Sequence, residues 1–419
     1  MTGSSVERAS MAGWSASQRG IDHRRHLYLL LDDWSWGYSI REVDLKSGSD
    51  KADKQIQGTI RSTGILLLPP PLSHIEAQRA SPLFFAGAFD SKIIVGHPVA
   101  PTINGGTPTM LPSSLLPMFD VRIRSIVLGP RPMPHPVEPI YFAVGGRLFS
   151  LDVHSFLLLY PPQRAKPDGP PTGWTWFKLP EPPFQRKDVV SYAVHPDGLT
   201  IFVSIQESSS VATFSFDTAE DVIRSDGCGW KQHGEWVLPF TGRAYFDYEL
   251  DAWVGLSRGH GTIGHLCSCD VVHADSDGTW RCQGLKVSKE KLFSQDLAER
   301  HVGATLVHMG GDNSKFCLVE GISFKDKWAD NMSDETDHRF VDDRSVKCDE
   351  NRVSDAMDCK LEEQNVSQPS HSLFRLTTFS LKYDKEGALT TGKSRRFRYY
   401  YLPEAISRSV LEYPVAFWL

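Results

Sequence analysis

The sequence predicts an all-β fold, a six-bladed β-propeller closed by pairing a C-terminal strand with the N-terminal blade. Three observations predict it. A short apolar or Trp-rich stretch ending in Leu-Pro or Gly-Pro returns about every fifty residues, a period typical of propeller blades. Short strand-like segments fill the intervals, and no interval has the periodicity of an amphipathic helix. The recurring stretches stand at residues 66–72, 126–132, 174–183, 235–240 and 398–404.

The first unit follows a tail, residues 1–25, which lacks hydrophobic periodicity and is expected to be flexible. Its strands are expected at 26–33 and 37–45, and proline terminates an outer strand at 65–71. The second unit has four segments of the same kind, so its strands are expected at 83–89, 91–98, 118–125 and 126–132.

The third and fourth units contain tight hairpins. Gly145 and Gly146 separate two alternating runs within 140–153, and glycine tolerates the positive φ that such a turn demands. Pro196, Asp197 and Gly198 form the corresponding turn signal within 189–206. The remaining strands of these units are expected at 156–162, 174–180, 211–218 and 235–240.

The last units explain how the ring would close. Strands of the fifth are expected within 243–257, 265–272 and 279–287, and those of the sixth within 302–322, 373–383 and 395–403. The first unit lacks a leading strand, whereas residues 410–419 are an apolar segment without a unit of their own. We therefore expect 410–419 to be the innermost strand of the first blade, because this pairing removes exposed sheet edges. A count of seven blades would require splitting 46–133.

The predicted propeller, residues 26–419, carries an acidic insertion at 324–372 within its last blade. Residues 325–372 hold 13 Asp/Glu against 7 Lys/Arg, which accounts for the whole net charge of −6. Low hydrophobicity predicts disorder there, either as a partner-binding arm or as a tolerated surface insertion. The neutral remainder lacks the clustered basic face of a nucleic-acid binder.

Cysteine usage and hydropathy bear on location. The seven cysteines have no disulfide-framework spacing, and no apolar stretch is long enough for a signal peptide or a membrane span. A reduced cytoplasmic or nuclear monomer without membrane contact is therefore expected, with an organelle signal in the first 25 residues as the alternative.

Four segments resemble a family of plant proteins, much expanded in grasses, that is described only as a domain of unknown function with a kelch-like propeller. These segments are 26–45, 142–153, 176–183 and 242–257, and the resemblance extends over roughly 26–419. It implies a kelch-like blade but brings no catalytic residues to this chain. Most blades depart from the kelch glycine pair, which stands at 145–146 and 310–311.

Two local patterns suggest cofactor chemistry and are better explained by packing. Residues 259–264, GHGTIG, match a dinucleotide-binding motif, but a strand rather than a helix follows them, so a loop is expected. The weak metal candidates are His260, His265, Cys267 and Cys269. Two thiols spaced C-x-C on a strand lack the knuckle geometry of a zinc site, and packing between blades is favoured. No cofactor is expected.

Catalysis has little support in the sequence. His195, Asp197, Asp247 and His308 would lie at inner-strand ends near a central channel, but turn aspartates usually bind backbone. No nucleophile elbow, zinc-protease helix or phosphate loop is present, so no catalytic residue is assigned. The basic and aromatic run at 395–401 alternates faces and fits an outer strand better than a single-strand nucleic-acid site.

The leading functional prediction is a non-enzymatic protein-interaction scaffold, such as substrate recognition in a ubiquitin-ligase or regulatory complex. Its protein partners would contact propeller-face loops, expected at 99–117, 154–172, 257–265 and 324–372. The alternative is a propeller enzyme or a small-ligand sensor, for a sugar or metabolite, that uses the central channel.

Overall fold

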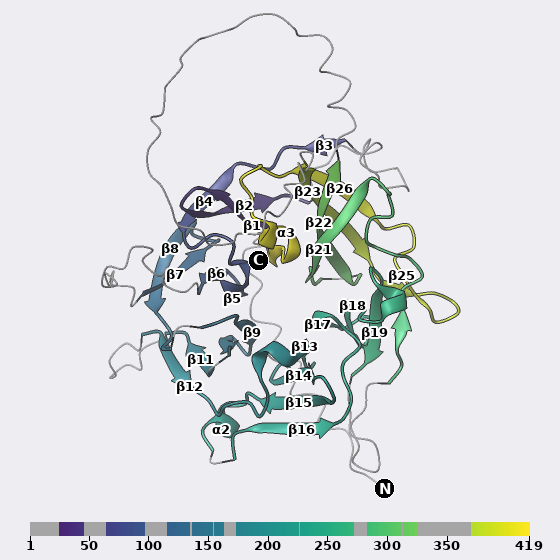
Figure 1. The fold of residues 1–419 in the computed structure, drawn as a ribbon. Helices are drawn as coiled ribbons and strands as arrows, with labels where there is room; N and C mark the ends of the chain where they lie inside the picture. The colour runs from purple at the N-terminus through teal and green to yellow at the C-terminus, as the bar shows by residue number, and fades with distance from the viewer. Residues whose placement is uncertain are drawn as a thin grey trace, which may run out of the picture.

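The computed structural model describes residues 25–45, 64–96, 115–134, 136–153, 155–162, 173–225, 227–271, 283–311, 313–325 and 370–419. The expected tail, except Arg25, and the bulk of the acidic insertion lie outside these residues, as do most of the loops at 99–117 and 154–172. The fold is all-β, and Figure 1 shows its sheets arranged around a common centre. No described helix is long and apolar enough to cross a membrane.

The first sheet joins the two ends of the chain in the order β27-β1-β2-β4. Its strands are β27 (Val415–Trp418), β1 (Leu27–Trp34), β2 (Gly37–Val43) and β4 (Pro71–Glu76). Strand β27 pairs antiparallel with β1 from Leu27↔Trp418 to Leu30↔Val415. The predicted pairing of the C-terminal strand with the N-terminal blade is confirmed, although the strand is shorter than 410–419 because α3 (Arg408–Glu412) precedes it.

Two further sheets follow the predicted hairpin order. One consists of β5 (Phe85–Ala88), β6 (Lys92–Val95), β7 (Leu115–Asp120) and β8 (Ser125–Pro130). The other consists of β9 (Ile140–Val144), β10 (Arg147–Leu151), β11 (Phe156–Tyr160) and β12 (Thr175–Lys178). Gly145 and Gly146 connect β9 to β10 with φ of 56° and 70°, which is the left-handed backbone that the turn needs.

An eight-stranded sheet combines the fourth and fifth predicted units. Its strands are β16 (Trp230–Gly234), β15 (Val211–Asp217), β14 (Thr200–Gln206), β13 (Val189–Val194), β17 (Gly242–Asp247), β18 (Ala252–Leu256), β19 (Leu266–Asp270) and β20 (Lys286–Val287), in that order. The two halves meet where β13 and β17 pair in parallel. Short helices lie between strands: η2 (Pro82–Phe84), η3 (Arg186–Asp188), α2 (Glu220–Ile223) and η4 (His260–Thr262).

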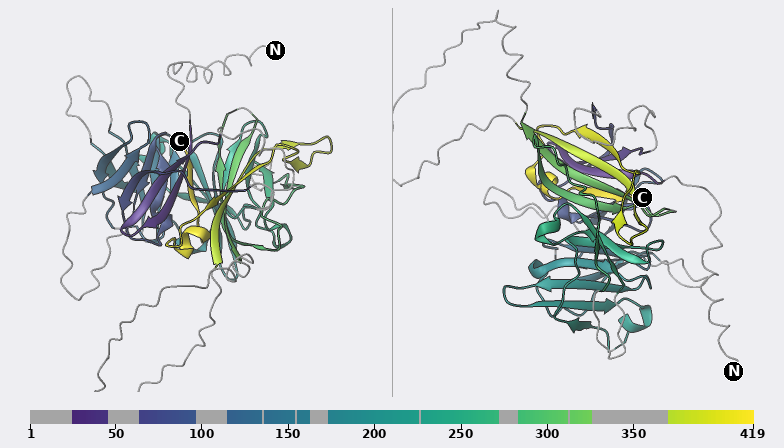
Figure 2. Two further views of the ribbon diagram at one scale, coloured as in Figure 1. Left: turned by 90° about the horizontal axis from the view of Figure 1, so that it is seen from above. Right: turned by 90° about the vertical axis from the view of Figure 1, so that its right-hand side faces the viewer.

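The last large sheet has the order β21-β22-β23-β26-β3. Its strands are β21 (Glu299–His308), β22 (Lys315–Lys325), β23 (Ser370–Ser380), β26 (Arg396–Tyr401) and β3 (Ile65–Leu66). A separate hairpin joins β24 (Lys382–Tyr383) to β25 (Leu389–Thr390). Helix α3 packs against β21 and β22, where a Cβ on Gly321 would lie 2.4 Å from the Leu411 carbonyl oxygen. Figure 2 shows α3 and the C-terminus on opposite faces of the molecule.

Two of the recurring proline-ended stretches are not the outer strands that the sequence predicted. Residues 65–66 form β3, which pairs in parallel with β26 of another sheet, and the outer strand next to β2 is β4. Three consecutive prolines, at 69–71, supply no N–H groups, so that run cannot form a continuous ladder. Residues 235–240 follow β16 instead of forming it, and Leu238 and Phe240 are fully buried beside Trp253.

The outer strand β16 carries a partly buried imidazole from which an acid-stability prediction follows. His233 Nε2 lies 2.7 Å from Ser215 Oγ, and its ring lies beside Phe202. Burial, with a smaller effect of Lys231, lowers the pKa of His233 from 6.5 to about 4. The unfolded chain therefore binds this proton first, and the stability that the neutral ring provides is lost as pH falls from 6.5 toward 4.

Between pH 6.5 and pH 4, we expect the His233→Gln variant to lose about 1 kcal/mol less unfolding free energy than the unchanged protein does. This value is reduced because the ring is partly exposed to solvent. Glutamine does not titrate and keeps a group able to bond Ser215. Urea unfolding at pH 7 and pH 4.5 measures the difference. Equal pH dependence in the variant and the unchanged protein would contradict this account of His233.

Candidate functional site

The parallel pairing of β13 and β17 builds a two-stranded wall. Its register is Ser191↔Gly242, Tyr192↔Arg243 and Ala193↔Ala244. Ala193 and Ala244 are 1% and 2% exposed and belong to the core cluster around Trp253. Because neighbouring residues of a strand point to opposite faces, Tyr192 and Arg243 lie on the other side of the wall, toward the centre of the molecule.

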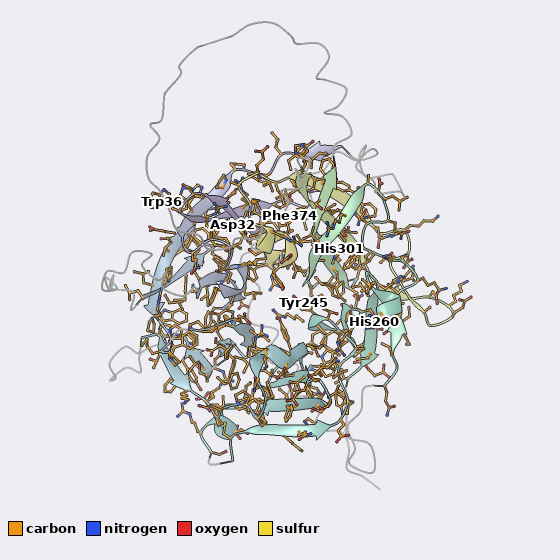
Figure 3. All side chains as sticks on the ribbon, in the orientation of Figure 1. Asp32, Trp36, Tyr245, His260, His301 and Phe374 are labelled. Atoms are coloured by element: carbon orange, nitrogen blue, oxygen red, sulfur yellow. The ribbon has the colours of Figure 1, made fainter. Side chains whose placement is uncertain are left out.

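Arg243 stacks on a neighbouring tyrosine of the same strand. Its guanidinium carbon lies 4.7 Å from the centre of the Tyr245 ring, and the Tyr245 hydroxyl donates to the Leu306 carbonyl of β21 at 3.0 Å. Figure 3 shows Tyr245 near the centre of the ring of sheets. Among the described residues no carboxylate forms a salt bridge with Arg243. Within the described ranges, the wall therefore presents a cation whose charge no paired acid neutralises.

A second guanidinium lies close to the same wall. Arg186 belongs to η3, immediately before β13, and its Nε is buried without a hydrogen-bond partner in the described part of the chain. Burial lowers the pKa of Arg186, whereas Tyr192 and Glu138 oppose that shift. Burial also raises the pKa of Tyr192, and the charge of Arg243 opposes it. Tyr192 is therefore a neutral phenol between two cations.

A buried network of charges lies on the neighbouring inner strand. His301 Nδ1 on β21 lies 2.8 Å from Glu320 Oε1, and Arg375 Nη1 lies 2.9 Å from Glu320 Oε2. Glu320 is fully buried and Arg375 is 5% exposed, whereas a third of the His301 side chain is exposed, at 32%. Figure 3 shows His301 on β21, close to Tyr245 in that view. The arrangement couples a reachable imidazole to a buried carboxylate.

A cavity of about 200 Å³ lies on the face that carries the C-terminus. It is bordered by Arg25, Gly87, Ala88, Phe89, Asp90, Ala143, Val144, Gly146, Arg147, Trp418 and Leu419. Arg147 is already paired, since its guanidinium lies 3.0 Å from Glu220 and bonds the Thr218 carbonyl. The Arg147 guanidinium is therefore committed to these partners and is not free to bind a ligand in the cavity.

The weak metal candidates are not brought together as a ligand set. His260 is exposed on η4, and His265 Nδ1 lies 2.8 Å from the Ser288 carbonyl oxygen. Cys267 and Cys269 lie on β19, fully buried in the cluster around Trp253. Within the described ranges no group of three or more His, Cys, Asp or Glu is arranged to hold a metal ion.

The four residues expected at inner-strand ends form two local pairs. His195 Nδ1 lies 3.0 Å from Asp197 Oδ2, and Asp197 also accepts from two backbone amides of its turn. Asp247 Oδ2 lies 3.3 Å from His308 Nε2 and bonds Ser314 and the following turn. Hydrogen bonds and His308 lower the pKa of Asp247 against the opposing effect of burial. Both aspartates therefore hold hairpin turns.

The two sequence motifs also have structural roles. Residues 259–264 form η4 and a turn that leads into β19, so the strand that was expected after GHGTIG is present. Residues 396–401 form β26, the outermost strand of the predicted sixth unit, and the two-residue strand β3 pairs with its far side. Tyr399 is fully buried there, and Arg398 donates to backbone carbonyls of Asp44 and Leu45.

Sequence reasoning missed the residues of the wall and of the charge network. The run 242–247 alternates Arg243 and Tyr245 with the small Ala244, which is a period-two signal for a polar face opposite a packed one. No comparable signal marks the network, because His301, Glu320 and Arg375 come from three strands that only the fold brings together.

Comparisons with known proteins give a family and a set of structural neighbours. A family model described as "Protein of unknown function (DUF1668)" matches residues 24–400. No curated protein matches the chain. A periplasmic gluconolactonase of Pseudomonas aeruginosa is 14% identical, with a TM-score of 0.38 over 90% of this chain and 99% of its own. A putative 6-phosphogluconolactonase of Bacteroides uniformis is 11% identical, with a TM-score of 0.40 over 94% and 100%.

These findings contradict the expected non-enzymatic protein-interaction scaffold, because the two solved structures just named are described as lactonases. At these scores the likeness carries no information on what this chain binds, so its ligand has to be argued from its own residues. The kelch-like blade pattern and the plant lineage stay predictions.

Proposed function

We propose that this chain, which belongs to the DUF1668 family of proteins of unknown function, is a six-bladed propeller that binds a small organic carboxylate in its central channel. Six groups of strands support the blade count, five with four strands and one with five, when the eight-stranded sheet is divided at the β13–β17 pairing. The antiparallel pairing of β27 with β1 supports closure of the ring by its two ends.

The observation that carries the proposed function is Arg243 on the central side of the wall. A guanidinium without a paired carboxylate is well suited to a ligand carboxylate, because two parallel N–H groups match the two carboxylate oxygens. Arg186 adds a second positive charge nearby, and its buried Nε has no partner in the described structure. Glu138 offsets part of the charge of Arg186, whereas Arg243 has no carboxylate partner among the described residues, so the local charge favours an anionic ligand over a neutral or cationic one.

The tyrosines limit the kind of anion. Tyr192 stacks edge-on with Phe142 at 5.3 Å, so its ring is held in place, and Tyr245 is held through its hydroxyl. Rigid rings beside a cation provide an apolar surface for the carbon skeleton of an organic acid. An inorganic ion such as sulfate would leave that surface unused.

We expect Arg243→Gln to weaken binding of the recognised acid about 10- to 100-fold, the usual effect of losing a charge-assisted hydrogen bond. Calorimetric titration with a panel of mono- and dicarboxylic acids and their amides measures it. Arg243→Lys keeps the charge but loses the paired donors, so its affinity for the acid should lie between those of the unchanged protein and Arg243→Gln. Arg122→Gln, which removes an exposed arginine outside the wall, is the matched control.

Two results would overturn the proposed function. One is a panel in which no acid binds the unchanged protein more tightly than its amide does. The other is a recognised acid whose affinity is the same for Arg243→Gln and Arg122→Gln.

A further inference from the structure

The imidazole of His301 is oriented from behind by a carboxylate that is itself held by several donors. Glu320 accepts from Arg375 at 2.9 Å and from the Ser294 amide at 3.2 and 3.3 Å, in addition to His301 at 2.8 Å. Arg375 is held in turn by the Leu292 carbonyl at 2.9 Å. The Glu320 carboxylate is therefore held in one position by donors of three other residues.

The hydrogen bond to the Glu320 carboxylate fixes the tautomer of His301. A carboxylate acceptor at Nδ1 requires the proton to be on that nitrogen, which leaves the lone pair on Nε2. Phe293 fixes the plane of the ring, since the two ring centres are 3.9 Å apart and the planes differ by 17°. The side chain is still 32% exposed. His301 is therefore a fixed, reachable imidazole whose Nε2 lone pair can accept a proton.

His301 lies on the strand next to the wall. Tyr245 of β17 bonds the Leu306 carbonyl of β21, so these two inner strands lie side by side at that level. His301 precedes Leu306 by five residues and Arg243 precedes Tyr245 by two. For inner strands that run the same way, a rise of about 3.3 Å per residue places His301 roughly 10 Å beyond Arg243, toward the face that carries α3.

From this juxtaposition we infer that His301 is the general base that hydrolyses an oxygen ester in a ligand whose separate, free carboxylate is bound at Arg243; the inference rests on the proposed function. Among the described residues no serine, threonine or cysteine hydroxyl or thiol is hydrogen-bonded to His301. Water, rather than a protein nucleophile, is then the group for Nε2 to deprotonate. The substrate class is an organic acid that carries an oxygen ester several bonds from its free carboxylate.

The reaction consumes one water. Nε2 takes a proton from water as the water oxygen forms a bond to the ester carbonyl carbon. The carbon–oxygen bond to the leaving alcohol then breaks, and the imidazolium gives its proton to the departing oxygen. One ester and one water become one carboxylic acid and one alcohol, and His301 returns to its neutral form.

The test uses 4-nitrophenyl monoesters of dicarboxylic acids from glutaric to suberic acid, with 4-nitrophenyl acetate as the neutral comparison. We expect the full chain to hydrolyse one or more of the longer monoesters faster than the acetate, with the optimum length set by the Arg243-to-His301 span. His301→Gln should lower kcat about 100-fold or more, with KM little changed, because general bases contribute this much. His74→Gln, an exposed histidine on β4, is the matched control.

A pH profile separates catalysis from a structural role. The rate of the unchanged protein should fall as the imidazole becomes protonated, and the residual rate of His301→Gln should lack that limb. Thermal melting and calorimetric binding of the parent acid check that the variant is folded and still binds. Hydrolysis that is equal in His301→Gln and His74→Gln, or absent from the unchanged protein, would overturn the inference. Failure of the proposed function would appear separately, as loss of acid binding.

Discussion

Removing residues Val415–Leu419 is expected to abolish cooperative folding at 37 °C or lower the melting temperature by at least about 15 °C. The deletion removes β27 and its ladder with β1, and it exposes the inner edge of a strand whose residues Leu27–Leu31 are at most 4% exposed. Lost hydrogen bonds and apolar burial together amount to about 5 kcal/mol or more, which is comparable to the whole stability of a typical domain. Circular dichroism during heating measures the change.

A shorter deletion provides the control. Leu419 exchanges two backbone hydrogen bonds with His26, at 2.9 and 3.2 Å, beyond the end of the β27 ladder. Removing Leu419 alone should cost about 1–3 kcal/mol, the value of two such bonds. If the five-residue deletion were no more harmful than the loss of Leu419, closure of the molecule by β27 would be refuted.

Glu320→Gln is expected to destabilise the protein by about 3–5 kcal/mol. The change leaves the guanidinium of Arg375, 5% exposed, without its carboxylate partner in an interior that solvates a lone charge poorly. The amide also cannot be the anion that orients His301, so any hydrolysis should fall even in the fraction that remains folded. Urea unfolding followed by tryptophan fluorescence measures the loss of stability.

Glu386→Gln is the matched change at the surface. Its carboxylate lies 3.0 Å from Lys289 and its side chain is 81% exposed, so the pair is screened by water. The melting temperature should hardly move. Equal effects of the two substitutions would mean that the Glu320 network contributes little to the fold.

Much of the fold can be predicted from local signals. Turn residues such as Gly145 and Gly146 specify hairpins through their backbone geometry, and a spare apolar segment at the C-terminus indicates that it completes another sheet. The recurring proline-ended stretches were a poorer guide. The same motif forms an outer strand at Ser125–Pro130, but crosses to another sheet at 65–66 and enters the core at 235–240. Which of these occurs depends on packing partners far away in the sequence.

The candidate site was harder to predict for the same reason. The sequence drew attention to His and Cys residues that are near one another along the chain, such as Cys267 and Cys269, and these proved to be packed in the core. Arg243 is one arginine among many until the β13–β17 pairing places it opposite Tyr192. The alternation of Arg243 with Ala244 indicated that the strand has a polar face opposite a packed one. It did not indicate that the polar face is turned toward the centre of the molecule.

A crystal structure with the tightest-binding acid of the panel tests the central claim most directly. We predict that the carboxylate lies within hydrogen-bonding distance of the Arg243 guanidinium, with the carbon skeleton against Tyr192 or Tyr245. For a longer acid, the far end should extend along β21 toward His301. An acid bound instead in the cavity beside Trp418, or anywhere away from the β13–β17 wall, would contradict the account.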